Sequence, residues 1–308
     1  MILCLGPTPC LQRTMIFDSL KPDAVNRTST VREFASGKPT NVARVVRTLG
    51  QAPMLLTFAG GIRGKAFEAD LLATRIPHQL IQVNPQTRMA ITLIDRAGHT
   101  ATELVEEPQS LSASNYDALL RALAENLGRA TMLVISGTLP PGAKPDFYAR
   151  CVEHASPSMP VIVDAVGPPL LEALVHRPLI VKPNRSELSR TLETPLDSDQ
   201  ATRSAMKELI ADGARWVITT NGALPTQVTN GRSFWQITAP PIKPVSAIGS
   251  GDAFAAGLAC AIARGEDIPR ACVFAAACGA ANALTPDAGH LSPVEVSRIA
   301  SSIELRVD

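Results

Sequence analysis

The stretch 130–136 reads Ala-Thr-Met-Leu-Val-Ile-Ser, and three runs of the same kind follow it along the chain. They are 161–165 (Val-Ile-Val-Asp-Ala), 179–183 (Leu-Ile-Val-Lys-Pro) and 215–220 (Arg-Trp-Val-Ile-Thr-Thr). Continuous apolar runs of this length are typical of strands that are buried on both faces. Candidate helices follow at about 145–155, 168–175, 186–192 and 200–212. Alternating strands and helices predict an α/β fold, with helices covering a mostly parallel sheet.

Two other segments, at about 8–34 and 80–106, alternate polar and apolar residues. Within the second, 89–95 has a strict alternation, and 96–99 (Arg-Ala-Gly-His) has the composition of a hairpin turn. Such strands have one wet face, so they do not fit a sheet that is covered on both sides. We expect them to form a small antiparallel lid within a single domain spanning 1–308. Long surface excursions are the alternative.

The bulk composition narrows the class of protein. The 308 residues, 45% of them hydrophobic, can bury a large core. A net charge of +1 and only 4% aromatic residues argue against a nucleic-acid partner. The apolar run 2–5 is too short for a signal peptide, and 253–263 is too short to span a bilayer. We therefore expect a cytoplasmic protein with no membrane partner.

Six cysteines are present, and none of them forms a CxxC pair. Their spacing does not suit a zinc site. Three of them lie in Ala-rich helical stretches, where a free thiol behaves as a small apolar residue. We expect buried, reduced thiols.

The strongest chemical signal lies at 248–264, where Gly249, Ser250 and Gly251 precede a run of helix formers. Small residues let backbone N–H groups converge on an anion, and the helix that follows adds its free N–H groups and positive dipole end. Asp252 follows this loop directly. It is either an ordinary helix cap or a base that takes a proton from an attacking hydroxyl.

Two further motifs have both structural and functional interpretations. Lys38 and Asn41 stand at the start of an amphipathic helix that ends at Gly50, where a turn lysine and an N-cap would also fit. Asn184 and Glu187 have the spacing of a capping box. Taken one at a time, these motifs leave the choice open.

Taken together and in this order, the motifs resemble those of the ribokinase-like (PfkB) family of carbohydrate kinases, over nearly the whole chain. Six stretches carry the resemblance: 8–14 (Thr-Pro-Cys-Leu-Gln-Arg-Thr), 36–43 (Ser-Gly-Lys-Pro-Thr-Asn-Val-Ala), 136–142 (Ser-Gly-Thr-Leu-Pro-Pro-Gly), 182–187 (Lys-Pro-Asn-Arg-Ser-Glu), 220–223 (Thr-Asn-Gly-Ala) and 249–252 (Gly-Ser-Gly-Asp). The resemblance implies a three-layer α/β/α domain with a β lid.

The resemblance also implies an ATP-dependent phosphotransferase that uses Mg²⁺, with K⁺ dependence left open. Asp252 would be the catalytic base, and Gly249, Ser250 and Gly251 would form the anion hole. Asn184 and Glu187 would order the water shell of Mg²⁺. The nucleotide side would comprise Lys182, Asn184, Thr220, Asn221, Gly222 and, near adenine, Asn282.

Within the family, the details resemble the branch of 1-phosphofructokinase and tagatose-6-phosphate kinase. Lys38, Arg88 and Ser136 fall where that branch holds the sugar's existing phosphate, and Gln12, Gly37 and Asn41 complete the expected sugar site. The acceptor would then be a hexose phosphate such as fructose 1-phosphate or tagatose 6-phosphate. The sequence departs from the family at Gln12, which stands in place of an aspartate that binds sugar hydroxyls. Four other departures are Thr8, Ser36, Pro39 and Pro225.

Two other functions stay open at this point. One is a kinase for an unphosphorylated sugar or nucleoside, and the other is a non-catalytic sugar or nucleotide sensor with a kinase fold. A Rossmann dehydrogenase is excluded because no GxGxxG motif follows the first strand. A homodimer through the open edge of the lid is also expected.

Overall fold

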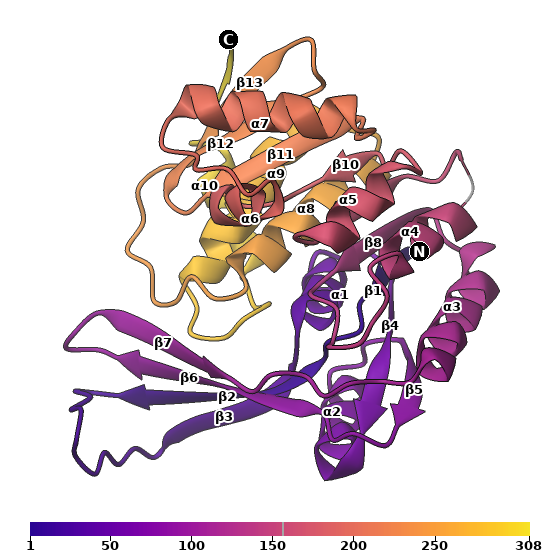
Figure 1. Ribbon diagram of the computed structural model, residues 1–308. Helices are drawn as coiled ribbons and strands as arrows, with labels where there is room; N and C mark the ends of the chain where they lie inside the picture. Colours follow the sequence, from indigo (N-terminus) through magenta and orange to yellow (C-terminus); the bar gives the residue numbers. More distant parts are fainter. Residues whose placement is uncertain (156) are drawn as a thin grey trace.

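The computed structural model describes residues 1–155 and 157–308. Its centre is a large sheet that crosses the molecule (Figure 1). Over the described residues, the strands follow one another in the spatial order β14 (Glu304–Val307), β13 (Phe234–Thr238), β12 (Leu224–Thr229), β11 (Trp216–Asn221), β10 (Ile180–Val181), β9 (Val161–Asp164), β8 (Met132–Ser136), β1 (Ile2–Leu5), β4 (Pro53–Gly60) and β5 (His78–Val83).

The strands from β5 to β11 pair in parallel, as predicted, and those from β11 to β14 pair antiparallel. Side chains of β1 alternate between two buried clusters. Ile2 and Cys4 enter one, and Leu3 and Leu5 enter the other. Because successive side chains of a strand point to opposite faces, a continuous apolar run has apolar contacts on both sides.

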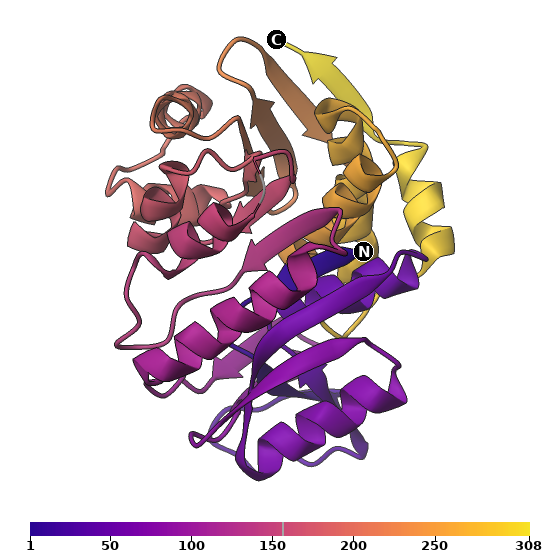
Figure 2. The same cartoon turned by 90° about the vertical axis from the view of Figure 1, so that its right-hand side faces the viewer.

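Helices cover both faces of this sheet (Figure 2). One layer holds α1 (Lys38–Thr48), α2 (Gly61–Ala73), α8 (Ser250–Ala263), α9 (Ile268–Ala283) and α10 (Pro293–Ala300). The other holds α3 (Ala113–Leu127), α4 (Phe147–His154), α5 (Pro168–Leu174), α6 (Arg185–Thr191) and α7 (Asp199–Ala211). The expected three-layer α/β/α architecture is confirmed. The six cysteines are free and buried.

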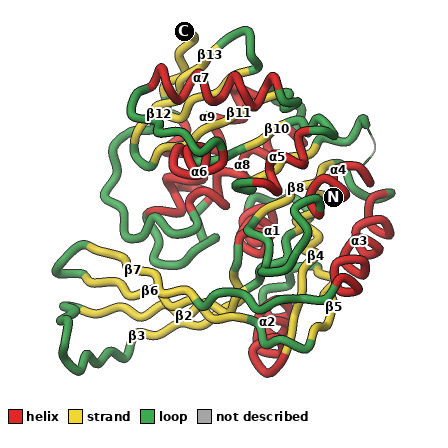
Figure 3. The backbone as a smooth tube through the Cα atoms, in the orientation of Figure 1, coloured by secondary structure: helices red, strands yellow, loops and turns green. Residues whose placement is uncertain are grey.

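A second, four-stranded sheet projects from the main body (Figures 1 and 3). Its order is β3 (Thr30–Ser36), β2 (Cys10–Phe17), β6 (Arg88–Asp95) and β7 (Thr100–Val105). We call this sheet the lid. The 96–99 turn joins β6 to β7 as predicted.

Two details of the lid differ from the prediction. Its central pair, β2 and β6, is parallel, while the two outer pairs are antiparallel. In addition, β5 lies inside the segment that we assigned to the lid, yet it pairs with β4 in the main sheet. The chain enters the lid twice from the main sheet, after β1 and after β5.

Candidate active site

A cleft of about 300 Å³ lies where the carboxyl ends of the parallel strands face the lid. This edge of an open α/β sheet is the usual place for a ligand. The cleft is lined by Cys10, Gln12, Ser36, Gly37, Lys38, Asn41, Arg88, Ala90, Glu103, Val105, Asp164, Lys182, Asn184, Glu187, Thr220, Ile248, Gly249, Gly251, Asp252 and Ala288. Most of the predicted site residues therefore meet in one cleft, although they come from both ends of the chain.

The Gly249–Gly251 turn leads into α8 at the bottom of the cleft. Gly249 has φ +81°, and a Cβ there would lie 2.8 Å from the backbone of Ala288 and Gly289. Only glycine fits such a position, because other residues strain at positive φ and would collide with the neighbouring loop. The first turn of a helix leaves N–H groups without helical partners. The turn thus brings free backbone donors to the wall of the cleft.

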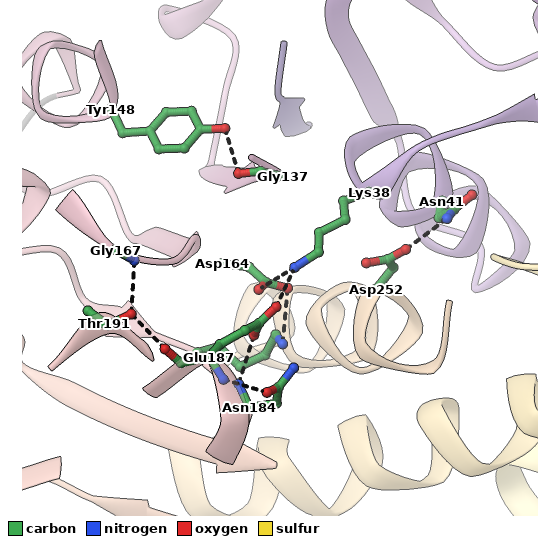
Figure 4. Close-up of polar contacts among 11 residues, drawn as sticks. Lys38, Asn41, Gly137, Tyr148, Asp164, Gly167, Asn184, Glu187, Thr191 and Asp252 are labelled. Atoms are coloured by element: carbon green, nitrogen blue, oxygen red, sulfur yellow. Dashed lines mark hydrogen bonds and ion pairs between the residues drawn. The ribbon is translucent and has the colours of Figure 1, made fainter. Parts of the chain in front are cut away.

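Asp252 sits in the first turn of α8 with an exposed fraction of only 6%. The side-chain amide of Asn41 donates a 2.7 Å hydrogen bond to its Oδ2 (Figure 4). The Ser36 hydroxyl in turn donates to Oδ1 of Asn41 (2.9 Å). Burial raises the pKa of Asp252 to about 7, although the charge of Lys38 and the Asn41 hydrogen bond both lower it. A carboxyl with this pKa exchanges protons near neutral pH.

Asn282, which we expected near adenine, is not part of the cleft lining. Its side chain is fully buried, and its amide nitrogen donates to the Ile248 carbonyl (2.9 Å) and the Ser250 hydroxyl (3.3 Å). Its Oδ1 accepts from the Gly289 N–H (2.9 Å). Asn282 therefore ties the glycine turn to the loop behind it, and the side chain of Ser250 is engaged in the same contact.

Four charged side chains meet beside the glycine turn. Lys182 Nζ lies 3.0 Å from Oδ2 of Asp164, and Lys38 Nζ lies 3.2 Å from both Asp164 Oδ1 and Glu187 Oε1 (Figure 4). Although burial opposes charge, the two lysines hold the pKa of Asp164 below its ordinary value. Burial likewise opposes charge on Lys38, yet Asp164 and Glu187 hold its pKa above the ordinary range. Asp164 and Lys38 are therefore both charged near neutral pH.

Asn184 and Glu187 form the capping box that their spacing predicts. Asn184 Oδ1 accepts from the Glu187 N–H (2.8 Å), and Glu187 Oε2 accepts from the Asn184 N–H (2.9 Å). Oε1 of Glu187 remains directed into the cleft, where it accepts from Lys38. The cap fixes the carboxylate, so the structural and the functional interpretations of this motif describe the same geometry.

On the lid side, Gln12 is 2% exposed, and its amide nitrogen donates to the Thr92 hydroxyl (2.8 Å). Arg88 lines the same wall. One Nη donates to the Glu106 carbonyl (3.3 Å), while its buried Nε has no partner among the described residues. Lys38 lines the same cleft as Arg88, and its ammonium pairs with Asp164 and Glu187.

Besides Ser250 and Asn282, three more predicted residues are not part of the cleft lining. Ser136 ends β8 fully buried, and its hydroxyl has no partner in the described part of the chain. Asn221 lines a separate pocket of about 90 Å³ together with Arg185, and Gly222 forms the turn between β11 and β12. Thr220, in contrast, lines the cleft and bridges to Asn184 in the sheet.

Two charged residues of the cleft were missed by the sequence analysis, namely Asp164 and Glu103. Asp164 had a visible signal, because it is a single carboxylate at the end of an apolar strand. Glu103 had none, since charged residues are common in a wet strand.

The sequence of this chain matches a known protein family. The sequence profile of the pfkB family carbohydrate kinases matches residues 1–295. The chain belongs to this family. It is therefore an ATP-dependent carbohydrate kinase. Among the residues that the structure describes, no helix is both long and apolar enough to cross a membrane.

Solved structures of other proteins match the fold of this chain over nearly its full length. Phosphofructokinase-2 from Escherichia coli, in complex with potassium, is 25% identical, with 98% of this chain and 97% of that chain covered and a TM-score of 0.88. A "Possible 1-phosphofructokinase" from Thermotoga maritima is 20% identical, with 100% and 99% covered and a TM-score of 0.91. Arabidopsis thaliana ribokinase, complexed with ribose and ATP, is 18% identical, with 97% of both chains covered and a TM-score of 0.73. The last two likenesses show the fold alone.

Proposed function

We propose that this kinase transfers the γ-phosphoryl group of ATP to a hydroxyl of a sugar phosphate, with Asp252 as the base. The observation that carries the proposal is the buried Asp252 carboxylate, which Asn41 holds at the glycine turn. The sugar hydroxyl gives its proton to Asp252 as its oxygen attacks the phosphorus, and the bond to the ADP oxygen breaks. A base whose pKa is about 7 suits this proton transfer.

The Gly249–Gly251 turn and the two lysines supply the electrostatic part of this mechanism. Backbone N–H groups of the turn bind the negative oxygens of the transferring group. Lys182 Nζ lies about 3.9 Å from the position of a Cβ on Gly251, so its positive charge lies beside the same place. These donors are in place before the reaction, so they need little reorientation when charge develops on the transferring group.

The residues at this end of the cleft fit Mg²⁺. Asp164, Asn184 and Glu187 offer carboxylate and amide oxygens, the ligand type that Mg²⁺ prefers. Among the described residues, no group of three His, Cys, Asp or Glu side chains is arranged to hold a metal. This agrees with an ion that takes most ligands from water and phosphate. When bound, Mg²⁺ would neutralise charge on the phosphate oxygens.

A phosphorylated acceptor is supported by Arg88. Its guanidinium lines the lid wall of the cleft, with one long hydrogen bond to a carbonyl and an unpartnered Nε. A guanidinium binds phosphate with several parallel hydrogen bonds, whereas a neutral sugar does not require that charge. The E. coli relative, phosphofructokinase-2, has been solved with fructose-6-phosphate. We extend the class of hexose phosphates to this chain, including fructose 1-phosphate and tagatose 6-phosphate.

The test is ADP release by the pure protein with Mg·ATP and a panel of acceptors. The panel holds fructose 1-phosphate, fructose 6-phosphate, tagatose 6-phosphate, fructose, ribose and adenosine. We expect turnover confined to a phosphorylated hexose and lost in Asp252→Asn, with ATP binding retained. Turnover only with a neutral sugar or nucleoside would refute the phosphate assignment to Arg88. Replacing K⁺ with Na⁺ in the same assay tests a potassium requirement.

We also propose that the lid mediates a homodimer. The lid face opposite the cleft carries apolar side chains that are partly exposed, among them Val31 (44%) and Leu104 (52%), and its edge strands β3 and β7 are open to further pairing. The E. coli relative has been solved as a tetrameric form. Light scattering of the wild type and of Val31→Lys/Leu104→Lys tests this; an unchanged mass would refute the lid interface.

A further inference from the structure

The lid wall of the cleft carries a carboxylate, Glu103, in a place where the mechanism above assigns no acid. Glu103 lies on β7, the edge strand of the lid, and lines the cleft together with Gln12 and Arg88. Its pKa is raised by partial burial, and the nearby Arg88 charge opposes that rise. Glu103 is exposed on this edge strand, and its place in the cleft lining brings its carboxylate within reach of a bound molecule.

Strand register places Glu103 next to the side chain that departs from the family. Glu103 is the direct cross-strand partner of Thr92, and Thr92 accepts the hydrogen bond from the Gln12 amide. Cross-strand partners lie on the same face of a sheet, with their Cβ atoms about 5 Å apart. Gln12, Thr92 and Glu103 therefore form one polar row across three strands of the lid, on the face that closes the cleft.

The chemistry of this row selects its ligand. Gln12 uses one N–H of its amide nitrogen for Thr92, so its carbonyl oxygen, an acceptor, remains available together with one further N–H. Glu103 is also an acceptor when ionised, and it forms no hydrogen bond or ion pair with the residues that the structure describes. Two acceptors side by side bind O–H donors and repel phosphate oxygens. Arg88 on the same wall has the opposite preference.

We propose that Glu103 binds hydroxyl groups of the acceptor sugar and thus performs the task of the aspartate that family members carry at the position of Gln12. This inference rests on the proposed kinase function and adds the way in which the sugar is oriented. The lid wall would bind the acceptor at two places, its phosphate at Arg88 and its hydroxyls at Glu103 and Gln12. The charge missing at position 12 is then supplied from the neighbouring strand.

The experiment compares the wild type with Glu103→Gln, using the acceptor that the wild type phosphorylates and its deoxy analogues, each lacking one hydroxyl. Loss of a hydrogen bond to a charged group corresponds to about a 10- to 100-fold rise in the acceptor KM. We expect a rise of that size, with the KM for ATP unchanged. At least one deoxy analogue should be discriminated against by the wild type and not by Glu103→Gln. A merely structural role would not remove discrimination at a single hydroxyl.

Two further variants sharpen the comparison. Glu107→Gln makes the same change just beyond the strand and outside the cleft lining, and it should leave both KM values unchanged. Gln12→Asp in the Glu103→Gln background returns a carboxylate to the row and should recover at least about tenfold in acceptor kcat/KM. No recovery would overturn the exchange of roles between positions 12 and 103.

The outcomes separate the two proposals. Absence of wild-type turnover with every acceptor overturns the proposed function. Wild-type turnover with an acceptor KM and a deoxy discrimination that are the same in Glu103→Gln overturns only the assignment of Glu103.

Discussion

Asn41 and Asp252 share a 2.7 Å hydrogen bond although 211 positions separate them in the chain. The amide favours the charged form of the carboxyl, while burial favours the neutral form. The balance between the two effects leaves a proton acceptor whose pKa is about 7. In the proposed mechanism, Asn41 therefore acts on the reaction through Asp252.

Asn41→Ala should shift the pH dependence of activity to higher pH. The base works when it is deprotonated, so wild-type kcat/KM should rise with pH through about 7. Removing a hydrogen bond to the charged form should move this rise up by about 1–2 pH units. The measurement is kcat/KM from pH 5.5 to 9.5, with Thr48→Ala on the same helix as a control. A lower plateau at an unchanged midpoint would contradict this account.

Asp252→Asn should be more stable than the wild type at alkaline pH. The pKa of Asp252 is raised from 3.8 to about 7 on folding, so the folded protein holds a proton that the unfolded chain releases. The stability present below pH 4 is therefore lost as pH rises to about 7. The free energy of unfolding at pH 8 should increase in the variant by about 1–4 kcal/mol. Urea denaturation at pH 5 and pH 8 measures it, and a gain that is larger at pH 5 would contradict the sign.

Gly249→Ala and Gly251→Ala form a matched pair in the same turn. A Cβ at Gly249 needs positive φ and meets backbone at 2.8 Å, whereas the nearest atom to a Cβ at Gly251 is Lys182 Nζ at 3.9 Å. We expect Gly249→Ala to lower the free energy of unfolding by about 2–5 kcal/mol. Gly251→Ala should change it by less than about 1 kcal/mol. Chemical denaturation of both variants decides, and equal losses would show that the neighbouring loop yields readily.

Lys182→Met should destabilise the fold more than the double variant Lys182→Met/Asp164→Asn. Lys182 and Asp164 are both almost fully buried and lie 3.0 Å apart. Removing one partner leaves an uncompensated buried charge, which costs about 3–5 kcal/mol. Lys38 remains beside Asp164, so we expect the lower end of that range. The comparison uses urea denaturation, with the exposed Lys65→Met as a control. A double variant no more stable than the single one would show that the pair is not coupled.

The central sheet was predictable because its signal is local. Each apolar run, such as 161–165, indicates a buried strand without knowledge of its neighbours. The glycine turn at 249–251 was predictable for a related reason, since small residues before a helix have few other uses. The antiparallel strands β12 to β14 were missed because they alternate irregularly and lie at the edge of the sheet.

What sequence could not provide is the pairing of distant side chains. Lys38 was expected at the sugar's phosphate, and its ion pairs with Asp164 and Glu187 could not be foreseen from the sequence. Asn282 was expected at the nucleotide, yet its backbone position directs it to the glycine turn. Glu103 became visible only through the register of β6 and β7. Each of these depends on which strands and helices become neighbours.

The position of β1 in the middle of the sheet, between β8 and β4, also bears on how the enzyme is made. β1 is a central strand, and its neighbour β8 is translated more than 120 residues after it. Asn41 likewise lies far in the sequence from its contacts at Asp252 and at Gly289, whose Cβ position would lie 2.8 Å from the Asn41 backbone. A nascent chain that has not yet reached Gly289 therefore lacks part of the packing around Asn41, so the Asn41–Asp252 pair should form only after these distant segments have been synthesised.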